Sequence, residues 1–155
     1  PVTPRVSGGQ PPPKTQPDTL GRPLRRPAVI VPKSGAAGAI VEGVLPGVVF
    51  VPGTARLQTS SFVALDSVAD LLRVAPDIRV EIGAHTDNSG SAADDGRITQ
   101  LQAEAVRDYL VVKGVSYQQM VARGYGSSVP LTPDTTPRGR AANRRVEIHR
   151  VLAGP

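Results

Sequence analysis

The sequence predicts an α/β (α+β) fold, a two-layer sandwich with the element order β-α-β-α-β-β, preceded by a Pro-rich N-terminal tail. Three observations predict it. Two stretches carry apolar residues at helical spacing, four short stretches are β-rich or alternate apolar with polar residues, and nine prolines lie within residues 1–32. Helices that alternate with strands pack back onto a sheet, which gives two layers around one core.

The first strand and the first helix are expected between residues 48 and 76. VVFV (48–51) is a β-rich run that a Pro-Gly turn closes. The stretch 59–75 offers Thr or Ser as an N-terminal cap and has Pro76 as its stop. Its apolar residues recur at the spacing of one helical face: Leu65, Val68, Leu72 and Ala75. We therefore expect a helix that buries this face.

The second strand and the second helix follow. DIRVEIGA (77–84) alternates strictly, with Ile78, Val80, Ile82 and Ala84 on one face, which indicates a strand with one buried side. Residues 85–96 are expected to form a polar loop. A second amphipathic helix then ends at Lys113-Gly114, a C-terminal signal. Its expected buried face consists of Ile98, Leu101, Ala105, Tyr109 and Val112.

Two further strands complete the predicted sheet. QMVARGYG (119–126) reads as a third strand, and RRVEIHRV (144–151) alternates as a fourth. The stretch between them, residues 127–143, is rich in Pro, Thr, Gly and Arg, and we expect it to be a loop.

Residues 1–47 are expected to be a basic, Pro-rich linker or tail, and residues 48–151 the folded domain. Proline fixes φ and removes an N–H donor, so nine prolines within 32 residues favour an extended spacer. Residues 28–47 stay open between short edge strands and loop. A spacer of about 30 residues at roughly 3.1 Å each would reach on the order of 90 Å.

Charge and composition exclude several classes of function. Residues 1–47 hold six Lys/Arg and two Asp/Glu, against twelve and eleven in the remainder, so the excess positive charge belongs to the tail. A nearly neutral domain without basic runs is not typical of nucleic-acid binding. No apolar run approaches the roughly 18 residues of a membrane-spanning helix. Because the chain begins at Pro1, we expect a fragment whose signal or anchor lies outside it.

The stretch EIGAHTDNSG (81–90) holds the best candidate site. Asp87 follows the carboxyl end of a predicted strand, with Thr86 beside it, and ligand crevices form at such ends in α/β folds. A carboxylate there can accept hydrogen bonds from an ammonium group, while loop N–H groups and a basic side chain bind a ligand's carboxylate. The alternative is that Asp87 caps a turn.

Catalysis and metal binding are not expected. The chain has two histidines, His85 and His149, and no cysteine, whereas catalytic zinc usually takes three protein ligands. The G-x-S-x-G pattern of a serine nucleophile does not occur, and GYGSS (124–128) lacks the Lys of a P-loop. We therefore expect no cofactor, no metal site and no enzyme activity.

Five motifs follow one another over about two thirds of the chain: FVPGTARL, RVAPDIRVEIGAHTDNSG, AEAVRDYLVVKGV, ARGYGSSVPLTPD and GRAANRRVEI. In this order they resemble the OmpA-like C-terminal domain family, the peptidoglycan-binding module of outer-membrane porins, the peptidoglycan-associated lipoprotein and flagellar stator proteins. The resemblance implies a domain of the periplasm or cell envelope, associated with the outer membrane through a part outside this fragment. It also implies that Asp87 holds the ammonium end of meso-diaminopimelate in the peptidoglycan stem peptide.

The sequence departs from the family pattern on the second predicted helix. The family's Arg fifteen positions after the Asp, which pairs with the ligand's carboxylate, is Gln102 here, and the family's Asn eight positions after the Asp is Asp95. A neutral amide binds a carboxylate more weakly than a guanidinium does, so both changes favour the ammonium end of the ligand. An amidated carboxylate in the cognate wall would restore the match with Gln102.

Arg144, in the NRR motif, is the expected replacement cation. Arg97 is the weaker candidate, because it lies five residues before Gln102 and points to a different helix face. The alternative is that Arg144 and Arg145 pair with acidic residues of the sheet and fix the last strand.

Three hypotheses for function follow. The first is non-enzymatic binding of the peptidoglycan stem peptide, which anchors a cell-envelope protein to the wall. Its expected ligand-binding residues are Asp87, Thr86, Gln102, Asp95 and Arg144. The second is a degenerate domain that has lost wall binding and acts as a protein-protein or assembly module of an envelope complex. The third, a hydrolase that depends on His85, is not expected.

Overall fold

The computed structural model describes residues 42–151, which include a four-stranded sheet. The strands are β1 (Gly43–Val44), β2 (Val80–His85), β3 (Met120–Gly126) and β4 (Arg145–Arg150). Their order across the sheet is β1-β4-β2-β3, with β2 and β3 parallel and β4 antiparallel to both β1 and β2. The carboxyl ends of β2 and β3 therefore meet the amino end of β4 at one end of the sheet.

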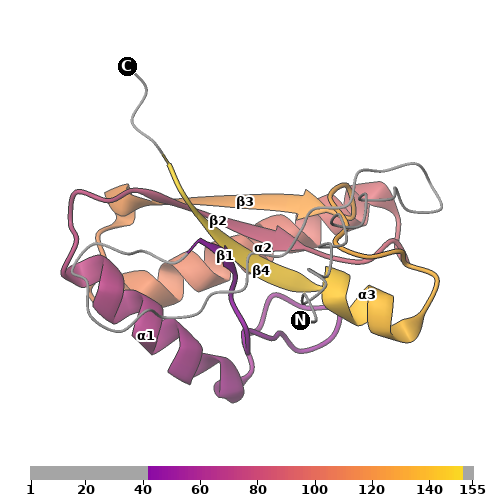
Figure 1. Cartoon of the computed structure of the whole chain (residues 1–155), viewed down its shortest axis with the longest axis horizontal. Coiled ribbons are helices and arrows are strands. Elements are labelled where there is room, and N and C mark those ends of the chain that lie inside the picture. The colour runs from indigo at the N-terminus through magenta and orange to yellow at the C-terminus, as the bar shows by residue number, and fades with distance from the viewer. Residues whose placement is uncertain (1–41, 152–155) are drawn as a thin grey trace, which may run out of the picture.

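Two helices, α1 (Phe62–Arg73) and α2 (Ala92–Val112), lie on one face of this sheet (Figure 1). α2 runs along β3 and β2, and α1 packs beside α2. A third helix, α3 (Pro137–Asn143), leads directly into β4. This arrangement confirms the predicted two-layer α/β sandwich.

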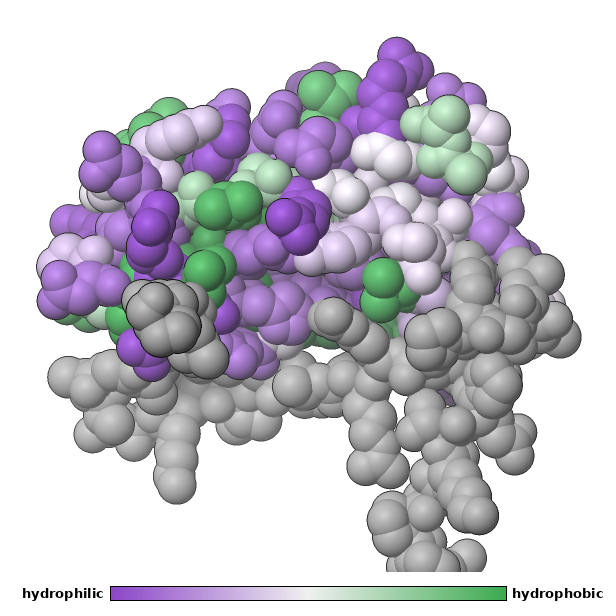
Figure 2. Space-filling model, turned by 90° about the horizontal axis from the view of Figure 1, so that it is seen from above, coloured by the Kyte–Doolittle hydropathy of each residue, from purple (hydrophilic) through white to green (hydrophobic). Residues whose placement is uncertain are grey.

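Aliphatic side chains from both layers form the core. The fully buried ones include Leu65, Leu72, Val80, Ile82, Val106, Leu110 and Ile148. The apolar face predicted for the first helix is confirmed, and Val80, Ile82 and Ala84 of the second strand are buried as predicted. The strand is not one-sided, however, because Gly83 and His85 on its other face are buried too, and β2 begins only at Val80. On the face that Figure 2 shows, apolar side chains are scattered among polar ones, as expected where water is the neighbour.

The prediction of a strand at residues 48–51 was wrong. This segment forms a local hairpin-like turn in which Phe50 bridges Leu57, the Val51 N–H donates to the Arg56 carbonyl, and the sheet is not involved. Ser61 anchors it: its hydroxyl accepts from the Val49 N–H and donates to the Val49 carbonyl, both at 2.9 Å. The outer edge of β4 pairs with β1 instead. β1 lies within residues 28–47, for which the sequence left both edge strand and loop open.

α2 begins earlier and buries a different face than the sequence predicts. Ser91 caps its start by accepting from the Asp94 N–H, so residues 92–96 are helix and not loop. The buried line is Asp95, Thr99, Ala103, Val106 and Leu110, whereas Leu101 and Val112 are 47% and 84% exposed. Counting apolar residues missed this face because two of its members are polar. Thr99, for one, donates to the Asp95 carbonyl and accepts from the Gly126 N–H.

α3 was missed by the prediction of a loop over 127–143. Thr136 caps it by accepting from the Gly139 N–H, and Pro137 occupies its first position, a favourable start for a helix. The fully buried Asn143 ends it and accepts from the N–H groups of Leu131 and Thr132. α3 thereby fixes where the chain enters β4, and with it the position of Arg144.

Candidate functional site

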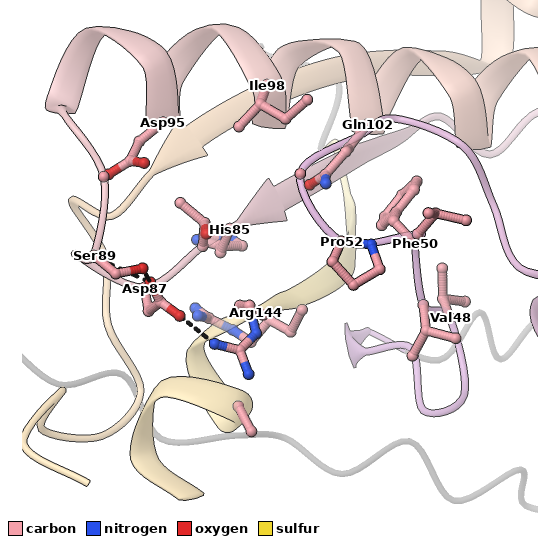
Figure 3. Close-up of a pocket in the computed structure, with 17 residues that line it drawn as sticks. Val48, Phe50, Pro52, His85, Asp87, Ser89, Asp95, Ile98, Gln102 and Arg144 are labelled. Carbon is pink, nitrogen blue, oxygen red and sulfur yellow. Dashed lines mark hydrogen bonds and ion pairs between the residues drawn. The ribbon is translucent and has the colours of Figure 1, made fainter. Parts of the chain in front are cut away.

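A pocket of about 640 Å³ opens where β2 ends, between the first half of α2, the end of α3 and the segment 48–53 (Figure 3). The residues that line it are Val48, Val49, Phe50, Val51, Pro52, Gly53, His85, Thr86, Asp87, Ser89, Gly90, Asp95, Ile98, Gln102, Ala141, Arg144 and Arg145. All five sequence-predicted site residues are therefore brought together here.

Asp87 is a buried charged group of the pocket that neighbouring residues hold in place. Its residue is only 2% exposed, and one carboxylate oxygen accepts from both the backbone N–H and the hydroxyl of Ser89. The other oxygen pairs with the Arg144 guanidinium, and both contacts are drawn in Figure 3. The turn predicted as an alternative role is thus present, and it coexists with an ion pair that faces the pocket.

These contacts keep the Asp87 carboxylate ionised. Burial acts to raise the pKa of Asp87, but the hydrogen bonds from Ser89 and from Arg144 outweigh burial, so that the pKa lies below its ordinary value. A carboxylate has room for about four hydrogen bonds. Asp87 can therefore accept a further donor from a ligand without losing the turn.

Asp95 supplies a second carboxylate, in the first turn of α2. It is 7% exposed and accepts a hydrogen bond of 3.0 Å from the Ser127 hydroxyl. The partial positive charge at a helix N-terminus stabilises an acidic side chain in this position. Asp95 and Asp87 thus make one end of the pocket acidic.

Gln102 lies two helical turns further along α2 and faces the loop that carries Pro52 (Figure 3). Its amide nitrogen donates to the Thr54 carbonyl at 2.9 Å. Gln102 therefore has a structural contact, which joins α2 to the wall of the pocket formed by residues 48–53.

The two arginines of the NRR motif have different roles. Arg144 is half exposed and reaches Asp87, so it belongs to the pocket. Arg145 is buried and its Nε donates to Glu147 at 2.7 Å, as the alternative for this motif predicts. Burial acts to raise the pKa of Glu147, but the hydrogen bond from His149 and the charge of Arg145 lower it overall.

Thr86 and His85 complete the end of β2. The Thr86 N–H donates to the Gly126 carbonyl at 3.0 Å, which ties the start of the loop to β3. His85 is the last residue of β2 and not a loop residue, and its ring stacks on Tyr125 with centroids 4.8 Å apart. Its Nε2 lies 3.6 Å from Glu147, so the histidine belongs to the buried network of the sheet.

Sequence reasoning missed three contributors to the pocket. Ser89 holds the Asp87 carboxylate, and its position two residues after an Asp is the signal of an Asx turn. Ser127 holds Asp95, and Thr54 holds Gln102, from 32 and 48 residues away in the chain. Contacts of such sequence separation leave no local pattern that could have revealed them.

Within residues 42–151, no group of three or more His, Cys, Asp or Glu side chains is arranged to hold a metal ion. In the same part of the chain, no helix has both the length and the apolar character needed to cross a bilayer.

The fold and the pocket together define a class: a small two-layer α/β domain with a polar, partly acidic pocket at the carboxyl end of a central strand. More particularly, the chain belongs to the OmpA family, whose family model matches residues 49–144. The resemblance seen in the sequence is thereby confirmed.

Individual relatives agree with this membership. The chain is 43% identical over 94 residues to the peptidoglycan-binding protein ArfA of Mycobacterium tuberculosis, a match that covers 61% of this chain and 29% of ArfA. It is 36% identical to outer membrane porin F of Pseudomonas fluorescens, over 59% of this chain and 28% of the porin. The chain thus spans less than a third of the length of these relatives.

Among solved structures, the peptidoglycan-associated lipoprotein of Burkholderia pseudomallei is similar in fold, with a TM-score of 0.64. The two chains are 28% identical, and the match covers 67% of this chain and 88% of the lipoprotein. The strand and helix arrangement described above is therefore that of other OmpA-like domains.

Proposed function

We propose that this domain binds peptidoglycan non-covalently, through meso-diaminopimelate of the stem peptide, and so anchors a cell-envelope protein to the wall. Membership of the OmpA family supports the proposal, as does the 43% identity to a protein named as peptidoglycan-binding. The single observation that carries it is the buried, ionised Asp87 carboxylate at the pocket.

The chemistry of the ligand fits this group. The side chain of diaminopimelate ends in an ammonium group and a carboxyl group on one carbon. Asp87 would accept from the ammonium, and charge-assisted hydrogen bonds of this kind are short and roughly twice as strong as neutral ones. Removing one such bond costs about 1.5 to 3 kcal/mol, or about ten- to a hundredfold in affinity.

The remaining site residues would surround the two ends of the ligand. Asp95 adds negative charge for the ammonium, and Thr86 lies beside Asp87 at the end of β2. Arg144, beside Asp87, and Gln102, further along α2, also border the pocket and would face the carboxyl end. Because half of the Arg144 side chain is exposed, it can turn from Asp87 toward a ligand.

We propose binding without turnover, in the periplasm or cell envelope, with the parent protein held near the outer membrane by a part outside this chain. The proposal needs no metal and no nucleophile.

The test is co-sedimentation of the whole chain with insoluble peptidoglycan sacculi. We expect the wild type in the pellet at low and moderate salt, and Asp87→Ala at least about tenfold weaker, because the ammonium loses its acceptor. Asp70→Ala is the matched control, because Asp70 is an exposed carboxylate on α1, outside the pocket. It is expected to bind like the wild type.

If the wild type stays in the supernatant, the proposed function is wrong and the assembly role becomes the better hypothesis. Equal binding of wild type and Asp87→Ala would remove Asp87 from the site. Release of soluble muropeptides during the incubation would contradict binding without turnover.

A further inference from the structure

Gln102 is placed so that a neutral partner suits it better than an anion. Its Nε2 donates to the Thr54 carbonyl, and a carbonyl oxygen can only accept. This contact therefore assigns the two ends of the amide: the NH₂ group faces Thr54, and Oε1 points away from it. Gln102 lines the pocket, and Oε1 is the end of its amide that Thr54 does not hold.

What Gln102 retains for a ligand is an acceptor and at most one N–H. A primary amide has two N–H donors, and Thr54 takes one. A ligand carboxylate can only accept, so it would place negative oxygens against Oε1. A ligand carboxamide donates and accepts, and can pair with both atoms that Gln102 offers.

The charges around Gln102 act in the same direction. Asp95 lies seven residues earlier on α2, on the same side of the helix, and is almost completely buried. The two arginines among the pocket-lining residues already have acidic partners: Arg144 pairs with Asp87, and Arg145 with Glu147. A carboxylate at Gln102 would therefore lie on the same side of α2 as Asp95, and an arginine among the described lining residues could reach it only by leaving its acidic partner.

We propose that this pocket selects a stem peptide in which the side-chain carboxyl group of diaminopimelate is a primary carboxamide. The inference rests on the proposed function and deepens it, because it names the chemical form of the ligand. The ammonium binds at Asp87 as before, and the carboxamide pairs with the Gln102 amide. The end of the ligand that enters the pocket thus carries one cationic group and one neutral group, and it is not a zwitterion.

The experiment compares two synthetic tripeptides, L-Ala-γ-D-Glu-meso-diaminopimelate with a free carboxylate and the same peptide with the carboxamide. Affinities of the whole chain for both are measured by calorimetry at one salt concentration. We expect the carboxamide form to bind about tenfold more tightly, a difference typical of one well-formed hydrogen bond. In Gln102→Arg the preference is expected to reverse, because a guanidinium pairs with a carboxylate.

Gln118→Arg is the matched control. It makes the same substitution at an exposed residue beside Arg79, at the opposite end of β2 from the pocket. The preference of the wild type is expected to persist in it. If the Gln102–Thr54 contact had a purely structural role, Gln102→Arg would bind both tripeptides more weakly by the same factor. The ratio of the two affinities would then equal that of the wild type.

The outcomes separate the two proposals. If the wild type binds both tripeptides equally, or prefers the carboxylate, the carboxamide inference is wrong while the proposed function stands. If Gln102→Arg still prefers the carboxamide tripeptide as the wild type does, Gln102 is not the residue that distinguishes the carboxamide from the carboxylate. If neither tripeptide binds the wild type, both proposals fail.

Discussion

Asp87 combines two tasks at the residue scale. It closes the turn after β2 through Ser89 and presents its second oxygen to Arg144 and the pocket. Sequence reasoning treated these tasks as alternatives, but a carboxylate has two oxygens and can do both. The Ser89 contacts orient the carboxylate before any ligand arrives, which reduces the entropy that binding would otherwise lose.

The pKa of Asp87 provides a residue-scale prediction. Ser89 donates twice to this carboxylate and Arg144 donates once, and all of these contacts lower its pKa. We expect Ser89→Ala to raise the pKa of Asp87, and Arg144→Ala to raise it as well. Both pKa values can be followed by NMR titration of the carboxyl carbon.

Arg97→Ala serves as the comparison, because Arg97 is exposed and pairs with Asp94 instead. In the Arg97→Ala variant, the pKa of Asp87 should equal that of the wild type. An unchanged Asp87 pKa in Ser89→Ala would mean that the Ser89 hydroxyl does not hold the carboxylate in solution.

At the scale of elements, the contact between α2 and β3 positions the acidic end of the pocket. Gln100 accepts from the Gly124 N–H at 2.8 Å and Thr99 accepts from the Gly126 N–H at 2.9 Å. The backbones approach so closely that a Cβ on Gly124 would lie 2.2 Å from the Gln100 nitrogen. Only glycine fits there, and Asp95 is placed as a consequence.

Two glycine substitutions test this contact. Gly124→Ala is expected to lower the free energy of unfolding by about 1 to 3 kcal/mol or more, because α2 and β3 must separate to admit the methyl group. Gly96→Ala, within α2, has no neighbour within 4 Å of the new Cβ. It is expected to raise the free energy of unfolding by about 0.5 to 1 kcal/mol.

Urea denaturation of both variants measures these changes. If Gly124→Ala proves as stable as the wild type, the close approach of the two backbones is not present in solution. The opposite signs expected for the two variants exclude a general effect of replacing glycine.

At the scale of the whole molecule, the folded unit begins before the boundary that the sequence predicts. β1 pairs with β4, and the Leu45 N–H donates to the Val146 carbonyl at 2.8 Å. The Leu45 side chain is 5% exposed and belongs to the core. Residues 43–45 lie in the segment that the sequence left open between edge strand and loop, and they pack on the domain.

Leu45→Ala tests this boundary in the whole chain. Leu-to-Ala substitutions in a core lower the free energy of unfolding by about 2 to 5 kcal/mol. A substitution in a solvated linker changes it by no more than about 0.5 kcal/mol. We expect the larger effect, measured by thermal or urea unfolding. Val63→Ala, at a side chain that is 78% exposed, is the control and should be close to neutral.

The sequence predicted the sandwich because its strongest signals are local. The alternation that leads to β2 and the helical spacing of α1 depend only on which residues neighbour one another along the chain. Asp87 and Thr86 could be placed at the pocket for the same reason, because they follow β2 directly. Asp95, Gln102 and Arg144 entered through the family resemblance, and the structure brings them to the same pocket.

The sequence by itself determined the α/β class, the amphipathic face of α1 and the strand before the site. The tertiary structure decided which segment pairs with β4, which face α2 buries, and which atoms hold Asp87, Asp95 and Gln102. The physical reason is distance along the chain. Periodicity reports contacts between near neighbours, whereas a sheet edge, a helix face and a pocket wall are chosen by partners tens of residues away.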